Sequence, residues 1–186
     1  PFNKIKWDAP TISAPTIFYG SVGTPWTYTF TAAGGSGSYS YSLPTNPASA
    51  SIDTSTGQVD FTPAAAGATN FVVRVTDTVS SETWDHAFSV HVYNADVCLW
   101  TGTTSTAWTT ASNWEFCGGG TPLTTSKIAI HSTAPNMPIL AATTTVDSFG
   151  LGVGGGTLTI NSGRSLITTS SSAFLSSVAM RGQTSN

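Results

Sequence analysis

The chain has 186 residues, of which 39% are hydrophobic and only 8% are charged, and its formal net charge is -3. The apolar content is too high for a disordered chain, and the few scattered Lys and Arg residues exclude the basic face that binding to nucleic acid requires. No apolar run is long enough to cross a bilayer, so membrane insertion is not expected.

Short alternating runs between Gly, Pro, Asn and Ser clusters predict β-strands in the first half of the chain, and helical periodicity is absent almost everywhere. In "WTYTFTA" the aromatic residues Trp26, Tyr28 and Phe30 share one face, and "YSYSL" repeats this alternation. "SIDTSTGQVDFTP" indicates strand, turn and strand, with Gly57 free to take a positive φ.

Two later runs, "NFVVRVTD" and "HAFSVHVY", alternate in the same way, so Phe71 and Val73 are expected inside and Arg74 outside. We expect six or seven strands within residues 16–94, the size of a small β-sandwich. Residues 1–15 are then a linker or the end of a preceding module, and the sandwich occupies residues 16–95.

From Asp96 the apolar units become shorter, and Leu158, Ile160 and Leu166 recur at short, fairly regular intervals. This spacing favours stacked rungs over long paired strands. The segment "GLGVGGGT" is predicted to be a tight corner of such a coil. A phosphate-binding loop is disfavoured because no Lys-Ser/Thr and no helix follow it. Residues 96–186 are therefore predicted to begin a β-solenoid, which is expected to continue in a longer protein.

The two cysteines, Cys98 and Cys117, enclose a segment rich in turn-forming residues. No second cysteine pair or nearby histidine completes a set of metal ligands, so a disulfide formed in an oxidising compartment is favoured over two free thiols. No metal site and no cofactor are expected.

The remaining candidates for catalysis are weak. His86 and His91 are an odd number of positions apart and would lie on opposite faces of a strand, and His131 has no acidic residue or cysteine nearby. All three are expected to be solvated. No "GxSxG" motif occurs, and the nine acidic residues are scattered except for Glu82 and Asp85. An enzyme is therefore not expected in this chain.

The stretch "SSETWDH" is the best candidate for recognition. It lies between two predicted strands and combines Trp84 with Glu82, Asp85 and His86, a set of groups that sugar-binding sites use. The competing interpretation is that Trp84 begins the last strand and packs inward, because it shares the alternation of Phe88. The alternation favours this second interpretation.

Residues 20–93 resemble the Ig-like and dystroglycan-type cadherin-like domains of bacterial surface proteins, through "GTPWTYTFTAAGGSGSYSYSL", "SIDTSTGQVDFTP" and "FVVRVTD". Cadherins bind calcium at domain junctions through several acidic motifs. Only Asp77 in "VTD" has a counterpart here, and the partner motif and acidic linker are missing. The resemblance therefore implies the fold without a calcium site.

Residues 99–168 are similar to a repeat of large secreted proteins of Gram-negative bacteria, in which a Trp-x-Gly start, an Asn-Trp pair and a downstream Pro lead into solenoid rungs. The matching pieces are "LWTG", "TAWTTASNW", "PNMPIL" and "GGGTLTINSGRSLITTS". Trp100, Trp108 and Trp114 fall on recurring positions of that repeat. The resemblance implies a structural aromatic cluster that covers an open end of the solenoid, in preference to a ligand platform.

The fold class predicted from the sequence is all-β: an Ig-like or cadherin-like β-sandwich, followed by a small, disulfide-stapled β-domain that resembles the start of a β-solenoid. The function expected is an extracellular adhesive or display module of a larger surface or secreted bacterial protein, which binds glycan or protein on another cell. The alternatives are a carbohydrate-binding accessory region of a secreted enzyme and a structural spacer or trimeric fibre segment.

Overall fold

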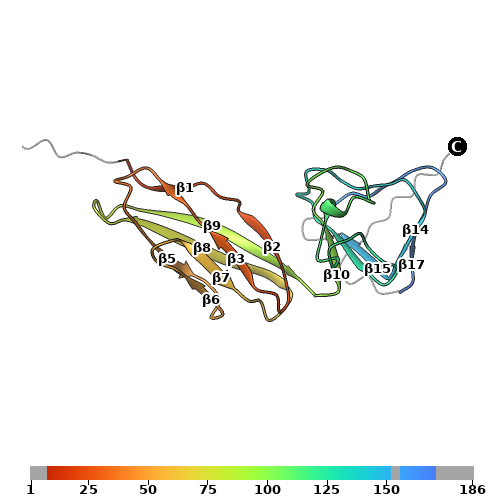
Figure 1. The fold of residues 1–186 in the computed structure, drawn as a ribbon, viewed down its shortest axis with the longest axis horizontal. Helices are drawn as coiled ribbons and strands as arrows, with labels where there is room; N and C mark the ends of the chain where they lie inside the picture. The colour runs from red at the N-terminus through yellow and green to blue at the C-terminus, as the bar shows by residue number, and fades with distance from the viewer. Residues whose placement is uncertain (1–7, 152–155, 171–186) are drawn as a thin grey trace, which may run out of the picture. The chain divides into compact units, whose positions relative to one another are not determined.

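The computed structural model describes residues 8–151 and 156–170 (Figure 1). Their regular secondary structure is almost entirely β-strand, with one short 3-10 turn, which confirms the all-β prediction. The chain divides into two compact units, with the division between Ala95 and Asp96. No helix in the described ranges is long and apolar enough to span a bilayer. The centre of the predicted corner, residues 152–155, and the tail 171–186 lie outside the described residues.

The first unit is built from nine strands. They are β1 (Thr11–Ile12), β2 (Ile17–Ser21), β3 (Trp26–Thr29), β4 (Ala32–Ala33), β5 (Tyr39–Thr45), β6 (Ala50–Ile52), β7 (Gln58–Phe61), β8 (Gly67–Asp77) and β9 (Thr83–Tyr93). Eight of them begin after residue 16, where the sequence predicts six or seven. The additional elements are short, as in the two-residue strand β4.

The longer strands form two facing sheets with the orders β2-β9-β8-β5 and β3-β7-β6. Neighbouring strands are antiparallel except β2, which runs parallel to β9 at one edge. A four-stranded and a three-stranded sheet in this arrangement make an Ig-like β-sandwich. The sandwich starts earlier than residue 16, because β1 pairs with β4 and Ile12 is buried in the core. Assigning all of residues 1–15 to a linker or to a preceding module is therefore wrong, since Thr11 and Ile12 belong to the sandwich.

The core lies between the two sheets and is made by the alternating residues that the sequence indicates. Phe71, Val73 and Val75 of β8 are at most 1% exposed, and Phe71 stacks on Phe88 of β9 with the ring centroids 4.8 Å apart. Burial of each such side chain stabilises the fold by about 1.5–3 kcal/mol. The predicted inward and outward faces of these two strands are confirmed over this region.

The turn before β7 depends on a glycine. Gly57 has a φ of 74°, and a Cβ atom at this position would lie 2.5 Å from the backbone oxygen of Phe30. Both the left-handed backbone and the lack of space therefore require glycine. The turn also uses Asp53, whose carboxylate accepts hydrogen bonds from the backbone N–H groups of Ser55 and Thr56.

The second unit contains eight short strands and one 3-10 turn. They are β10 (Val97–Trp100), η1 (Ala111–Asn113), β11 (Trp114–Glu115), β12 (Lys127–Ile130), β13 (Ile139–Leu140), β14 (Thr144–Val146), β15 (Ser148–Leu151), β16 (Thr159–Ile160) and β17 (Leu166–Thr168).

Parallel pairing dominates this unit. β10, β12 and β15 form one parallel sheet, β13 pairs with β16, and β14 pairs with β17, so that β12, β13 and β14 are stacked in order on β15, β16 and β17. Paired residues such as Lys127 and Ser148 are about 20 positions apart along the chain, a spacing within the range of stacked repeats. The buried side chains of Ile128, Ile130 and Leu140 form the core of the middle layer.

Candidate functional site

The candidate site lies at the tip of the longest hairpin in the sandwich. β8 and β9 pair antiparallel over ten residue pairs, with Val75 opposite Trp84 and Thr76 opposite Thr83. The pairing continues into the turn, where the backbone N–H of Asp77 donates to the oxygen of Glu82 at 2.9 Å. Figure 1 shows that this hairpin extends beyond β3, β6 and β7 of the facing sheet.

Trp84 is exposed at this tip. Its side chain lies near the start of β9 and is 45% exposed, whereas Val75 opposite it on β8 is fully buried. The interpretation that Trp84 packs into the core is therefore wrong. Alternation gives the correct face of the strand, but β2 pairs with β9 only from Ser89 onward, so the edge of β9 at Trp84 is not covered by β2. The segment is only partly a loop, because residues 80–82 lie in the turn whereas β9 begins at Thr83.

The structure separates the four residues that the sequence groups here. Glu82 and Trp84 are two positions apart along an extended segment, so they project from the same face, and both are exposed. Asp85 projects from the opposite face. His86 is half-buried, with Nε2 3.2 Å from the backbone oxygen of Pro15. We call the exposed patch formed by Glu82 and Trp84 the Trp84 surface.

The opposite face of the hairpin carries an ion pair. Nε and Nη2 of Arg74 each lie 2.7 Å from an oxygen of Asp85, directly across the strand pair. These hydrogen bonds lower the pKa of the Asp85 carboxyl and raise the pKa of the Arg74 guanidinium. Both side chains are more than 40% exposed, so the pair adds little stability. The pair does, however, engage both carboxylate oxygens of Asp85 in hydrogen bonds with Arg74.

Asp77 fixes the turn beneath the Trp84 surface. Its carboxylate is fully buried and accepts hydrogen bonds from the backbone N–H groups of Ser36, Val79 and Ser80 and from the hydroxyl of Ser36. These donors, the N–H of Ser36 first, hold the pKa of the carboxyl well below its usual range. Asp77, the one residue with a counterpart in the cadherin calcium motifs, thus accepts hydrogen bonds from backbone N–H groups of its own domain.

The lowered pKa of Asp77 predicts a stability loss in acid. A carboxyl whose pKa is lowered in the folded state stabilises the protein above its unfolded pKa of about 4, and this stabilisation is lost as the pH falls below that value. We expect the urea midpoint of the sandwich to fall between pH 5 and pH 2, and to fall less in Asp77→Asn. The variant should also melt roughly 5 °C or more lower at pH 7. Asp53 and Asp85 titrate in both proteins, so a difference between the two pH profiles comes from Asp77. Equal pH dependence of the wild type and the variant would contradict this role.

The prediction that all three histidines are solvated is wrong for two of them. His91 in β9 is 9% exposed, and burial lowers its pKa. His131 follows β12 and is 2% exposed, with Nδ1 2.9 Å from the hydroxyl of Thr133. Both belong to the packed interior. Nowhere in residues 8–151 and 156–170 do three potential metal ligands converge.

Comparisons with known proteins identify no family. No protein-family model matches the chain, and no curated protein does. Several solved structures resemble it weakly, among them the following three. A SusE-like surface-located polysaccharide-binding protein from Bacteroides thetaiotaomicron has 11% identity and a TM-score of 0.35, over 67% of this chain and 20% of that one. The extracellular cadherin domains 1–4 of protocadherin gamma B7 have 17% identity and a TM-score of 0.38, over 46% of this chain and 24% of that one.

The third is an endo-fucoidan hydrolase of glycoside hydrolase family 107, with 17% identity and a TM-score of 0.40, over 50% of this chain and 14% of that one. The chain thus spans a quarter or less of the length of each of these three proteins. Because every TM-score is below 0.5, none of these likenesses assigns a function to the chain.

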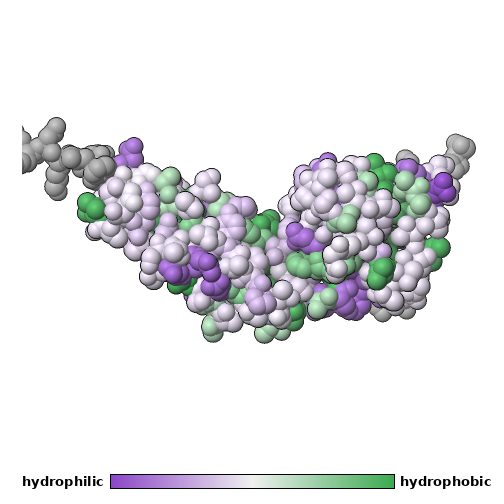
Figure 2. All heavy atoms as spheres, in the orientation of Figure 1, coloured by the Kyte–Doolittle hydropathy of each residue, from purple (hydrophilic) through white to green (hydrophobic). Residues whose placement is uncertain are grey.

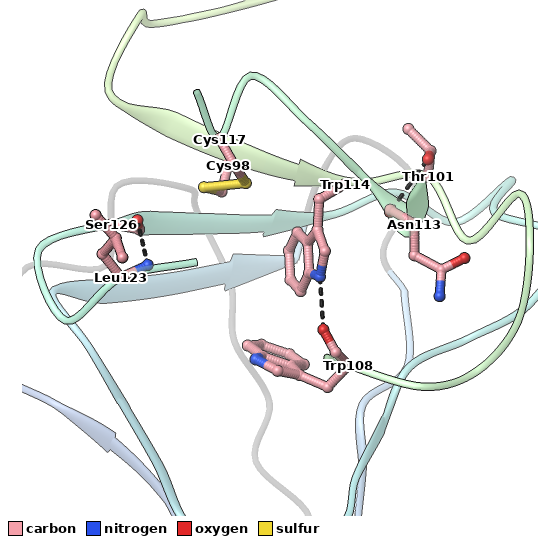
Figure 3. The surroundings of a disulfide bond; sticks show 8 residues. All are labelled: Cys98, Thr101, Trp108, Asn113, Trp114, Cys117, Leu123 and Ser126. Atoms are coloured by element: carbon pink, nitrogen blue, oxygen red, sulfur yellow. Dashed lines mark hydrogen bonds between the residues drawn. A yellow bond between two sulfur atoms is a disulfide. The ribbon is translucent and has the colours of Figure 1, made fainter. Parts of the chain in front are cut away.

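Residues 98–117, which carry both cysteines, lie at the beginning of the second unit. Cys98 of β10 and Cys117, just after β11, form a disulfide with their Cα atoms 4.7 Å apart, which confirms the predicted bond (Figure 3). Trp100, Trp108 and Trp114 are all buried, with ring centroids 4.7–6.3 Å apart. Figure 3 shows the Trp114 indole pointing toward Trp108, whose backbone oxygen accepts its N–H at 2.7 Å. The three indoles therefore pack as part of the interior and offer no open ligand platform.

Asn113 organises this stretch, and it was not among the residues that the sequence predicted to be structurally important. It is fully buried: Oδ1 accepts the backbone N–H groups of Thr104 and Ser105 at 2.9 Å, and Nδ2 donates to the hydroxyl of Ser105 and to the oxygen of Ala107 at 3.0 Å. Its own backbone oxygen accepts the N–H of Thr101. The one signal in the sequence is the Asn-Trp pair.

Proposed function

We propose that this chain is a non-catalytic binding and display module of a larger extracellular protein, either secreted or on a bacterial surface. In this proposal the Trp84 surface makes the contact with a glycan or protein on another cell. The observation that carries the proposal is the exposure of a tryptophan, at 45%, on the best-paired hairpin of the sandwich. The weakly charged surface, mostly pale in Figure 2, is suited to such a module.

A rigid aromatic group favours binding because little conformational freedom is lost when a partner covers it. An indole has two side-chain torsions and a large apolar face, and its N–H can donate to a hydroxyl or carbonyl. Here the backbone beneath it is held by strand pairing and by the buried Asp77 carboxylate in the adjoining turn. Little conformational entropy is therefore lost at this position when a partner binds.

For the second unit, we infer the beginning of a β-solenoid that serves as a rod or spacer. The support is the stacking of β12, β13 and β14 on β15, β16 and β17 in parallel register. In such an architecture each layer is covered by its neighbours, which makes an extended, stiff support. The same observation favours the second candidate function, a structural spacer without a ligand of its own.

The test is binding of the purified, oxidised chain to a glycan array and to whole bacterial cells. We expect Trp84→Ala to reduce selective binding at least tenfold, because the largest exposed contact area is lost. The matched control is Val79→Ala, which removes another exposed apolar side chain from the same hairpin and should leave binding unchanged. Binding by Trp84→Ala at the wild-type level would place the contact elsewhere. The spacer function would be supported if the wild type bound no surface.

A further inference from the structure

The charges around the Trp84 surface restrict the kind of ligand that it can hold. Arg74 is the only Lys or Arg between residues 8 and 95, and its guanidinium is occupied by Asp85. Glu82 is exposed, and its side-chain carboxylate makes no hydrogen bond or ion pair within the described part of the chain, whereas its backbone groups bond within the turn. The Trp84 surface therefore combines an aromatic face with an unneutralised carboxylate.

This combination is complementary to a cation. The face of an indole attracts an ammonium group within about 6 Å of the ring, and a carboxylate beside it adds a direct ion pair. Residues two positions apart on an extended segment are about 7 Å apart, so one ligand residue can contact both Glu82 and Trp84. A sulfated, phosphorylated or uronic glycan finds no basic partner here and would be repelled by Glu82.

We propose that the Trp84 surface binds glycans whose sugar rings carry free amino groups. This inference rests on the proposed function and specifies its ligand class. One sugar ring lies on the indole of Trp84, and its ammonium group pairs with the carboxylate of Glu82. Removal of the charge from the sugar, by acetylation of its amino group, removes the ion pair but keeps the apolar contact with the indole.

The experiment is a titration of the intact, oxidised chain with β-1,4-linked glucosamine oligomers, followed by calorimetry and tryptophan fluorescence. Fully N-acetylated oligomers of the same length and heparin serve as neutral and anionic comparison ligands. Binding to the glucosamine oligomer should be about tenfold tighter than to its acetylated form and should weaken as salt is added.

Variants test the two contacts separately. Glu82→Gln should weaken glucosamine binding about fivefold or more and leave the acetylated oligomer unaffected, because only the charge is changed. Asp60→Asn is the matched control, since it removes one exposed carboxylate from the three-stranded sheet and should change the affinity less than twofold. Trp84→Ala should weaken binding of both oligomers.

The outcomes separate this inference from the proposed function. Equal affinities for the two oligomers, or an unchanged affinity in Glu82→Gln, would overturn the amino-sugar inference while leaving a glycan site at Trp84. Tighter binding to heparin than to glucosamine oligomers would overturn it as well. If no glycan binds, the inference fails, and binding to whole cells that depends on Trp84 would then show that the proposed function survives with another ligand.

Discussion

Replacement of Asn113 by alanine is expected to lower the free energy of unfolding of the second unit by about 3–5 kcal/mol. The alanine would leave the backbone N–H groups of Thr104 and Ser105 without their acceptor around a fully buried position, and the oxygen of Ala107 would keep only its long hydrogen bond from the N–H of Thr110. Each unsatisfied buried group costs about 1–3 kcal/mol. The expected loss is a large share of the total stability of an ordinary domain.

Urea unfolding of the whole chain measures this effect. Trp100, Trp108 and Trp114 report on the second unit through near-ultraviolet circular dichroism, since their rings are in contact. Ser112→Ala is the matched control: Ser112 is the exposed neighbour of Asn113 and should lose less than about 0.5 kcal/mol. If Asn113→Ala and Ser112→Ala had similar midpoints, the buried hydrogen bonds would not determine the stability of this unit.

The fold of the sandwich could be predicted from the sequence because its signal is local. Alternation in "NFVVRVTD" reports which side chains face the core, and Phe71, Val73 and Val75 are buried as the pattern indicates. The start of the domain was less predictable. Ile12 belongs to a two-residue strand, too short to show any alternation, and its pairing with Ala32 and its burial in the core are what tie it to the sandwich.

The candidate site could be predicted only in part, because exposure depends on distant parts of the chain. The stretch containing Trp84 was recognisable from composition, but the exposure of its indole depends on where β2, which is distant in the sequence, begins to pair with β9. The burial of His131 likewise depends on the packing of the second unit. Asn113 gives no periodic signal at all, because its partners are backbone groups whose positions are set by an irregular segment.

The second large effect is expected from the disulfide. Replacement of both Cys98 and Cys117 by alanine should lower the free energy of unfolding of the second unit by about 3 kcal/mol, because the unfolded chain regains the freedom of a loop of roughly 20 residues. The bond joins β10 to the segment that follows β11, a strand that pairs with β10 through only two residue pairs. So short a pairing holds weakly without the covalent link.

The sandwich provides the internal control for this prediction, because it contains neither cysteine and has a separate core. In the double variant, and in the wild type under reducing conditions, the near-ultraviolet signal of the tryptophan cluster should be lost at lower urea. Far-ultraviolet circular dichroism reports the strands of both units, and the part of its transition that comes from the sandwich should keep its midpoint. If the urea midpoints of the second unit and of the sandwich fell together, the two units would unfold as one. An unchanged tryptophan transition would mean that packing of the three indoles alone holds the loop against β10.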